Sequence, residues 1–124
     1  MNEDLKRLIR KLWSPEFTED IRHRMVDVSL YPHLRSGIPD KYICLEEAFK
    51  ENEIDEIFER FKPFVTEHQI FPIMAGYGNQ TICIGSGKEN FGQVYYYDFD
   101  FGAFCLGCSL SEFCNSLVKS DGKL

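Results

Sequence analysis

Three cysteines in the last twenty residues have types and a spacing that could support metal or redox chemistry. Cys105 and Cys108 are separated by two residues, and Cys114 follows them. A zinc site needs four ligands, and the other candidates are distant in sequence: Cys44, Cys83, His23, His33 and His68. A redox pair normally opens a helix, and Cys108 directly precedes Ser109, a predicted helix N-cap. We interpret the thiols as small buried hydrophobic groups, with a metal or redox role as the alternative.

Two carboxylates form a second candidate site. Asp98 and Asp100 alternate along a predicted strand, so both side chains should lie on one face of it. Such a pair could bind Mg²⁺ or Ca²⁺, but no third acidic residue lies nearby in sequence. We therefore interpret this pair as part of an exposed surface that binds a partner and predict no metal.

The remaining motif with possible chemistry is a glycine-rich segment. Gly85-Ser86-Gly87-Lys88 resembles a phosphate-binding loop, which needs a glycine five residues before its Gly-Lys pair and a Ser or Thr after the lysine. Ile82 and Glu89 occupy those positions, so we predict a hairpin turn. The three histidines have no paired nucleophile in the sequence pattern. We predict no catalytic residue, no cofactor and no enzymatic activity.

The charge of the chain restricts its partners. The formal net charge is −6, from 14 basic and 20 acidic residues. Phosphate contacts require clustered Lys and Arg, so the balance argues against nucleic-acid binding and favours a basic protein partner.

No apolar run reaches the roughly 20 residues that span a bilayer. A charged N-terminus and an odd number of cysteines, five, lead us to expect a cytoplasmic protein with reduced thiols.

Periodicity and turn signals predict the elements that position these residues. Apolar spacing predicts helices over residues 3–13, from 15 to about 27, and over about 45–61, with loop punctuation over 31–40. Strands are expected at 70–75, 81–84, 92–100 and 104–106, followed by a helix that Ser109 and Glu112 begin as a capping box. Short loops between the strands predict an antiparallel meander. We expect one α+β domain over residues 1–124, with helices on one face of the sheet.

Several of these pieces occur in an order that resembles the SUKH superfamily of cell-wall regulators and bacterial toxin-immunity proteins. The resemblance covers about residues 63–118. It rests on Ile70-Phe71-Pro72-Ile73, the turn Gly76-Tyr77-Gly78-Asn79, Thr81-Ile82-Cys83-Ile84, Gly92-Gln93-Val94-Tyr95-Tyr96-Tyr97-Asp98 and Ser109-Leu110-Ser111-Glu112-Phe113. Leu45-Glu46-Glu47-Ala48 is similar to a stretch that precedes the family's sheet. The helical first 40 residues lack the family's usual opening.

The resemblance implies an α+β fold, no catalysis, and a protein that binds and neutralises a toxin domain, often a nuclease. A nuclease is basic, so an acidic inhibitor would approach it under electrostatic steering. We expect the partner to contact two aromatic and six acidic residues: Tyr95, Tyr97, Asp98, Asp100, Glu47, Glu51, Asp55 and Glu59. The alternative is an acidic adaptor of the cell-wall-regulator type with no toxin partner. In either case we expect a monomer or weak dimer.

Overall fold

The N-terminal segment forms two helices and then enters the sheet earlier than expected. The computed structural model describes residues 3–78 and 80–119, without the side chains of residues 64–66. Helix α1 (Glu3–Ile9) continues into the 3-10 helix η1 (Arg10–Trp13), as predicted. Ser14 then caps α2 (Pro15–Ile21) by accepting a hydrogen bond from the Phe17 amide at 3.2 Å. The prediction that this helix runs to Asp27 was wrong, because Met25 and Val26 are buried in strand β1 (Arg24–Asp27).

The central segment differs most from the sequence prediction. After the 3-10 helix η2 (Val28–Leu30), Pro32 starts helix α3 (Pro32–Gly37) within the expected loop. Strand β2 (Tyr42–Ala48) occupies the first part of the predicted helix 45–61. Its side chains alternate between exposed and buried up to Leu45, and it pairs with β1 on one side. The later part is helical, as η3 (Glu51–Glu53) and α4 (Ile54–Arg60), and α5 (Lys62–His68) follows.

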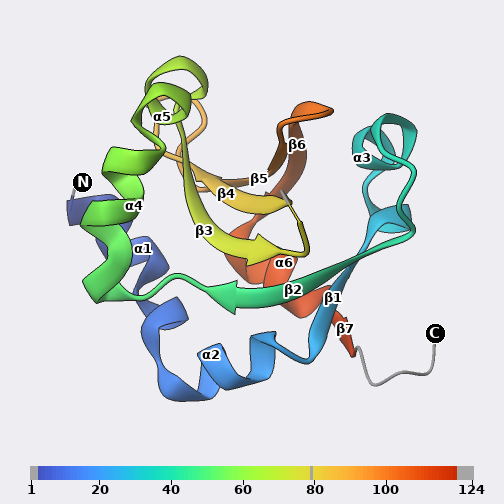
Figure 1. Cartoon of the computed structure of the whole chain (residues 1–124), viewed down its shortest axis with the longest axis horizontal. Coiled ribbons are helices and arrows are strands. Elements are labelled where there is room, and N and C mark those ends of the chain that lie inside the picture. Colours follow the sequence, from blue (N-terminus) through green and yellow to red (C-terminus); the bar gives the residue numbers. More distant parts are fainter. Residues whose placement is uncertain (1–2, 79, 120–124) are drawn as a thin grey trace.

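The sheet is a curled, antiparallel meander, which confirms the predicted fold class and topology. Its later elements are β3 (Ile70–Gly76), β4 (Thr81–Gly85), β5 (Gln93–Asp98), β6 (Gly102–Ser109), helix α6 (Leu110–Asn115) and β7 (Val118–Lys119). The strand order is β6-β5-β4-β3-β2-β1-β7, and every pairing is antiparallel. Figure 1 shows α1 and α4 on the left of the sheet and α3 on the right.

One face of the sheet carries the main core. Ile82, Ile84, Val94 and Tyr96 point into it, and helices α1, α2, α3, α4 and α6 supply buried side chains to the same cluster. The opposite face carries a smaller cluster of Ile70, Cys83, Tyr97 and Tyr95. Helices therefore gather on one face as predicted, except that His68 at the end of α5 contacts Tyr97 on the other face, with ring centroids 5.8 Å apart.

The antiparallel order separates the molecule into two ends. The turn end holds the β1–β2, β3–β4 and β5–β6 connections, at residues 28–41, 77–80 and 99–101. The helix end holds the other connections: η3, α4 and α5 between β2 and β3, the loop 86–92 between β4 and β5, and α6 after β6. Functional residues can thus be assigned to one end or the other from the register alone.

Both edges of the sheet are partly covered. The two residues of β7 pair with Arg24 and Met25 on the outer side of β1. At the other edge α3 lies against β6, and a Cβ at Gly37 would overlap the Phe104 ring. Glycine at position 37 therefore permits the close approach of α3 to β6. Within the described part of the chain, no helix has the length and apolarity needed to cross a membrane.

Candidate protein-binding surface

Asp98 organises the turn between β5 and β6. Its side chain is only 5% exposed. One carboxylate oxygen accepts hydrogen bonds from the backbone N–H groups of Asp100 (2.8 Å) and Phe101 (2.6 Å), and the other accepts one from the Tyr96 hydroxyl. Burial and the neighbouring Asp98 raise the pKa of Tyr96, which keeps this hydroxyl protonated as a donor. The buried Asp98 carboxylate therefore fixes the backbone of the turn through these hydrogen bonds.

This geometry corrects the expectation that Asp98 and Asp100 share a strand face. Strand β5 ends at Asp98, and Asp100 lies in the turn with an exposed side chain. The carboxylate of Asp98 replaces the backbone partners that a longer strand would have supplied, as Asp commonly does in turns. The two carboxylates thus have different environments, one buried and one at the surface.

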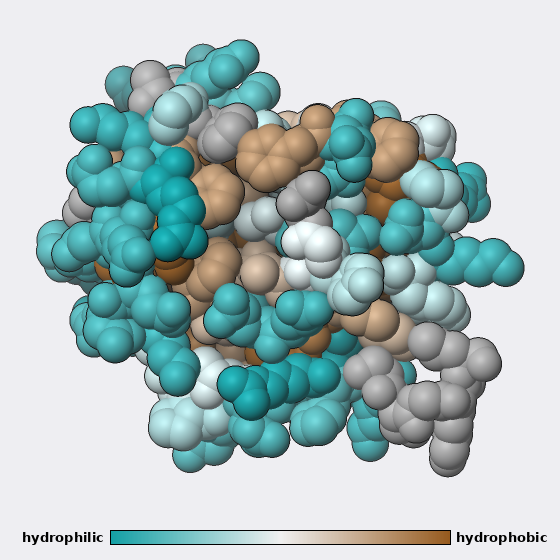
Figure 2. All heavy atoms as spheres, viewed as in Figure 1, coloured by the Kyte–Doolittle hydropathy of each residue, from teal (hydrophilic) through white to brown (hydrophobic). Residues whose placement is uncertain are grey.

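Large apolar side chains gather at the turn end. Among the residues whose side chains the structure describes, six large hydrophobic ones are exposed: Phe91 lies at the helix end, and the other five are Leu30, Tyr42, Tyr77, Phe99 and Phe101. Tyr77 is 74% exposed, Phe99 56% and Phe101 50%. Figure 2 shows hydrophobic side chains across the middle of this view, with hydrophilic side chains to the left and below. Such clustering is typical of surfaces that bind other proteins.

The two predicted tyrosines lie on the sheet face opposite the main core. Tyr97 is buried and meets Phe99 edge to face, with ring centroids 5.7 Å apart and planes at 83°. Tyr95 is half-buried, and its hydroxyl accepts a hydrogen bond from the Asn90 side chain at 3.3 Å. Burial raises the pKa of Tyr97. Tyr97 consequently offers a partner little surface of its own and instead supports the exposed Phe99.

The predicted acidic residues do not form one helix face. Glu47 belongs to β2, where the register places it opposite Ala75. Glu51 lies in η3, and Asp55 and Glu59 lie in α4, all three exposed at the helix end. The helical region expected over about 45–61, with a possible break at Asn52, was wrong in its first part, because residues 42–48 pair as strand β2 between β1 and β3. The structure therefore places Glu51, Asp55 and Glu59 at the opposite end of the sheet from Asp100.

Three of the five cysteines have surroundings that favour the protonated thiol. Burial is the main cause that raises the pKa values of Cys83, Cys108 and Cys114. The Cys105 thiol donates a hydrogen bond to the Gln93 side chain at 3.1 Å. Among the described residues, no group of three or more His, Cys, Asp or Glu side chains is arranged to hold a metal ion. A raised pKa disfavours the thiolate that metal binding or redox exchange requires.

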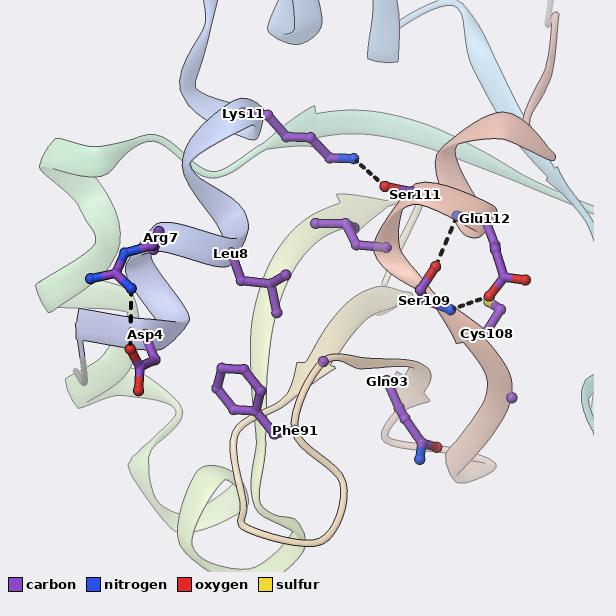
Figure 3. A pocket seen from close by; sticks show the side chains of 13 residues that line it. Asp4, Arg7, Leu8, Lys11, Phe91, Gln93, Cys108, Ser109, Ser111 and Glu112 are labelled. Atoms are coloured by element: carbon purple, nitrogen blue, oxygen red, sulfur yellow. Dashed lines mark hydrogen bonds and ion pairs between the residues drawn. The ribbon is translucent and has the colours of Figure 1, made fainter.

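The helix end contains a hollow of about 1130 Å³ between α1, the loop before β5 and the start of α6. In Figure 3 its polar side chains bond to one another: Lys11 to Ser111 at 3.2 Å and Arg7 to Asp4 at 3.6 Å. Leu8 and Phe91 lie on the same side of it. Because its charged groups pair with neighbours, the hollow offers apolar surface and no assembled acid, base or nucleophile.

The same figure shows the predicted capping box at the start of α6. The Glu112 amide donates to the Ser109 hydroxyl at 3.2 Å, and the Ser109 amide donates to the Glu112 carboxylate at 2.9 Å. The hydrogen bond from the Ser109 backbone lowers the pKa of Glu112, with a further contribution from the Ser109 side chain. This prediction is confirmed, and it marks where β6 ends.

The sequence prediction missed the exposed aromatic residues of the turns. Tyr77 lies between two glycines, and Phe99 and Phe101 lie between Asp98 and Gly102. Turn residues are seldom buried, since a buried loop leaves backbone polar groups without partners. Large aromatic side chains within turn punctuation were therefore a signal for an exposed apolar surface.

Two comparisons with known proteins bear on this surface. The RhsPI family model matches residues 20–118. No curated protein matches the sequence. The matched region begins near the end of α2. It includes the whole of strands β1 to β6 and ends at Val118, the first residue of β7. It contains the complete turn end and excludes α1 and η1.

Proposed function

Because this chain belongs to the RhsPI family of Rhs-associated immunity proteins, we propose that it binds the toxic domain of an Rhs effector and neutralises it without catalysing a reaction. The match over residues 20–118 is the observation that carries this proposal. The resemblance to SUKH proteins indicates the same kind of protein, and membership of that superfamily stays a prediction.

Charge supports a basic toxin, such as a nuclease, as the partner. The chain has a net charge of −6, and a protein that holds nucleic acid presents clustered Lys and Arg. Opposite charges raise the rate of encounter and suppress wrong partners. In this proposal Asp100 and Glu47, with Glu51, Asp55 and Glu59, provide negative potential. Tyr95, Tyr97 and Asp98 hold the sheet and turn that the toxin contacts.

The proposal places the encounter in the cytoplasm. All five cysteines are unpaired in the structure, which fits a reducing compartment. An immunity protein that acts there would intercept the toxin after its delivery and before it reaches its substrate.

Co-expression with the toxic domain of an Rhs effector from the same genome tests the proposal. We expect the chain to restore growth and to copurify with the toxic domain. Titration of purified toxin should show protection that is complete at one chain per toxin. Protection by far fewer chains than toxin molecules would instead indicate catalysis.

A second measurement separates immunity from the adaptor alternative. Growth inhibition that persists despite full expression of the folded chain, with no complex in solution, would contradict the proposal. An unrelated immunity protein of similar size and charge provides the control, because acidity alone should not protect.

A further inference from the structure

We propose that the Phe99-Asp100-Phe101 turn, with the neighbouring Tyr77, is the anchor that inserts into the toxic domain. This inference rests on the proposed function and names the surface through which it acts. The partner it fits is a basic protein domain with an apolar pocket for the aromatic rings and Lys or Arg at the rim of that pocket, facing Asp100.

The register brings the components of this surface together. Thr81, the first residue of β4, pairs with Tyr97, and Asp98 pairs with Gly102. The β3–β4 connection that carries Tyr77 therefore lies at the same end of the sheet as the β5–β6 turn that carries Phe99 and Phe101, and the Tyr77 amide donates to the Cys44 carbonyl of β2. We name Tyr77, Phe99, Asp100 and Phe101 the aromatic turn surface. It combines three exposed aromatic side chains with one exposed carboxylate.

The turn is held by hydrogen bonds within the unbound chain. Asp98 accepts hydrogen bonds from the backbone amides of Asp100 and Phe101, and Tyr96 secures the same carboxylate from the core. From the opposite face Tyr97 supports the Phe99 ring edge to face. A preordered anchor loses little conformational entropy on binding, which increases affinity. These buried contacts explain why the exposed rings have defined positions.

Aromatic residues at the centre of an interface commonly dominate its binding energy, and surrounding charges select the partner. The exposed Asp100 between two phenylalanines provides such a charge. The helix end also carries exposed carboxylates, at Glu51, Asp55 and Glu59. None of the exposed large hydrophobic side chains among the described residues lies in η3 or α4, however. The aromatic turn surface therefore combines exposed apolar area with an acidic side chain that a basic toxin would recognise.

The test compares Phe99→Ala/Phe101→Ala with Phe91→Ala, measured by calorimetric titration of the toxic domain into each purified chain. Phe91 is 41% exposed at the helix end and provides a matched control of the same residue type. We expect the double variant to bind about 100-fold more weakly and Phe91→Ala to stay within about threefold of wild type. Asp100→Lys should weaken binding about tenfold or more, because it places a cation against a basic rim.

Hydrogen exchange of the wild-type complex gives a second measurement that needs no variant. We expect new protection at the amides of residues 98–102 and not along α4 or α6. Wild-type affinity in the double variant, or protection confined to the helix end, would overturn the inference while leaving the proposed function intact. Failure of the wild-type chain to bind the toxic domain would refute the proposed function itself.

Discussion

The turn end and the helix end each carry acidic residues and exposed apolar atoms, yet they differ in organisation. At the turn end Asp98 is buried beneath exposed aromatic rings and fixes their backbone. At the helix end Glu51, Asp55 and Glu59 are exposed on η3 and α4, and Glu56 pairs with Arg60. Strand β6 joins the two, with Asp98 opposite its first residue and Ser109 as its last. In the proposed complex the turn end makes the close contact and the helix end supplies long-range attraction.

Removal of the buried carboxylate should have the largest effect. Asp98→Ala leaves the Asp100 and Phe101 amides and the Tyr96 hydroxyl without their acceptor, so we expect the free energy of unfolding to fall by about 3 kcal/mol. The aromatic turn surface loses its order as well, and toxin binding should weaken even where the variant is fully folded. Urea unfolding followed by titration of the folded protein measures both effects. Unchanged stability would show that these hydrogen bonds contribute little.

Neutralising the acidic residues of the helix end should change the rate of association. For Glu51→Gln/Asp55→Asn/Glu59→Gln we expect association with a basic toxin to slow about tenfold at low salt, with dissociation unchanged. Stopped-flow measurements at low and high salt would test this, since screening should remove the difference. A faster dissociation would mean that these side chains belong to the contact itself, and the contrast between the ends would fail.

Ser109→Ala provides the counterpart of Asp98→Ala at the helix end. The serine caps α6 through the Glu112 amide, and loss of an N-cap costs about 1 kcal/mol. We expect this loss of stability in urea with no change in toxin affinity. An affinity loss comparable to that of Asp98→Ala would place the start of α6 in the interface.

The smallest effect concerns pH. Hydrogen bonds from Ser109 lower the pKa of Glu112 in the folded state. A lowered folded pKa contributes stability above the unfolded value of 4.5, and this contribution is lost as the pH falls through the folded value. We expect wild type to exceed Glu112→Gln in stability at about pH 7 and the difference to narrow towards about pH 3. A stability difference between wild type and Glu112→Gln that is the same at the two pH values would contradict this.

Local signals in the sequence predicted the later part of the fold and failed in the centre. Glycine turns and the Ser109 capping box act within a few residues, so the four strands β3 to β6 and the start of α6 were predictable. The closing helix was expected to reach Val118, but Val118–Lys119 forms β7, because it pairs with the distant strand β1. Leu45-Glu46-Glu47-Ala48 consists of strong helix formers. Its pairing with β1 and β3 depends on residues that are distant in sequence, and such tertiary context overrides propensity.

The candidate site was predictable in part for the same reason. The composition predicted contacts by acidic and aromatic residues. Asp100 does lie in the β5–β6 turn, and Tyr97 supports Phe99 of that turn from the sheet. The alternation rule placed Asp98 beside Asp100 because it assumed that β5 continued. The Asp98 carboxylate instead accepts hydrogen bonds from the Asp100 and Phe101 amides where the strand ends, and only the three-dimensional structure shows that these bonds form.

The coverage of the sheet edges has a consequence for a protein whose task is to hold another protein. An open outer strand offers unpaired backbone groups on which a second chain can extend the sheet, the route to fibrous aggregates. Here β7 covers the outer side of β1 and α3 lies against β6, while Gly102 and Gly107 in β6 adopt positive φ angles of 94° and 71°. These features disfavour backbone addition along part of each edge. A toxin of the proposed kind would then be recognised through side chains, which can discriminate among partners where a bare strand edge could not.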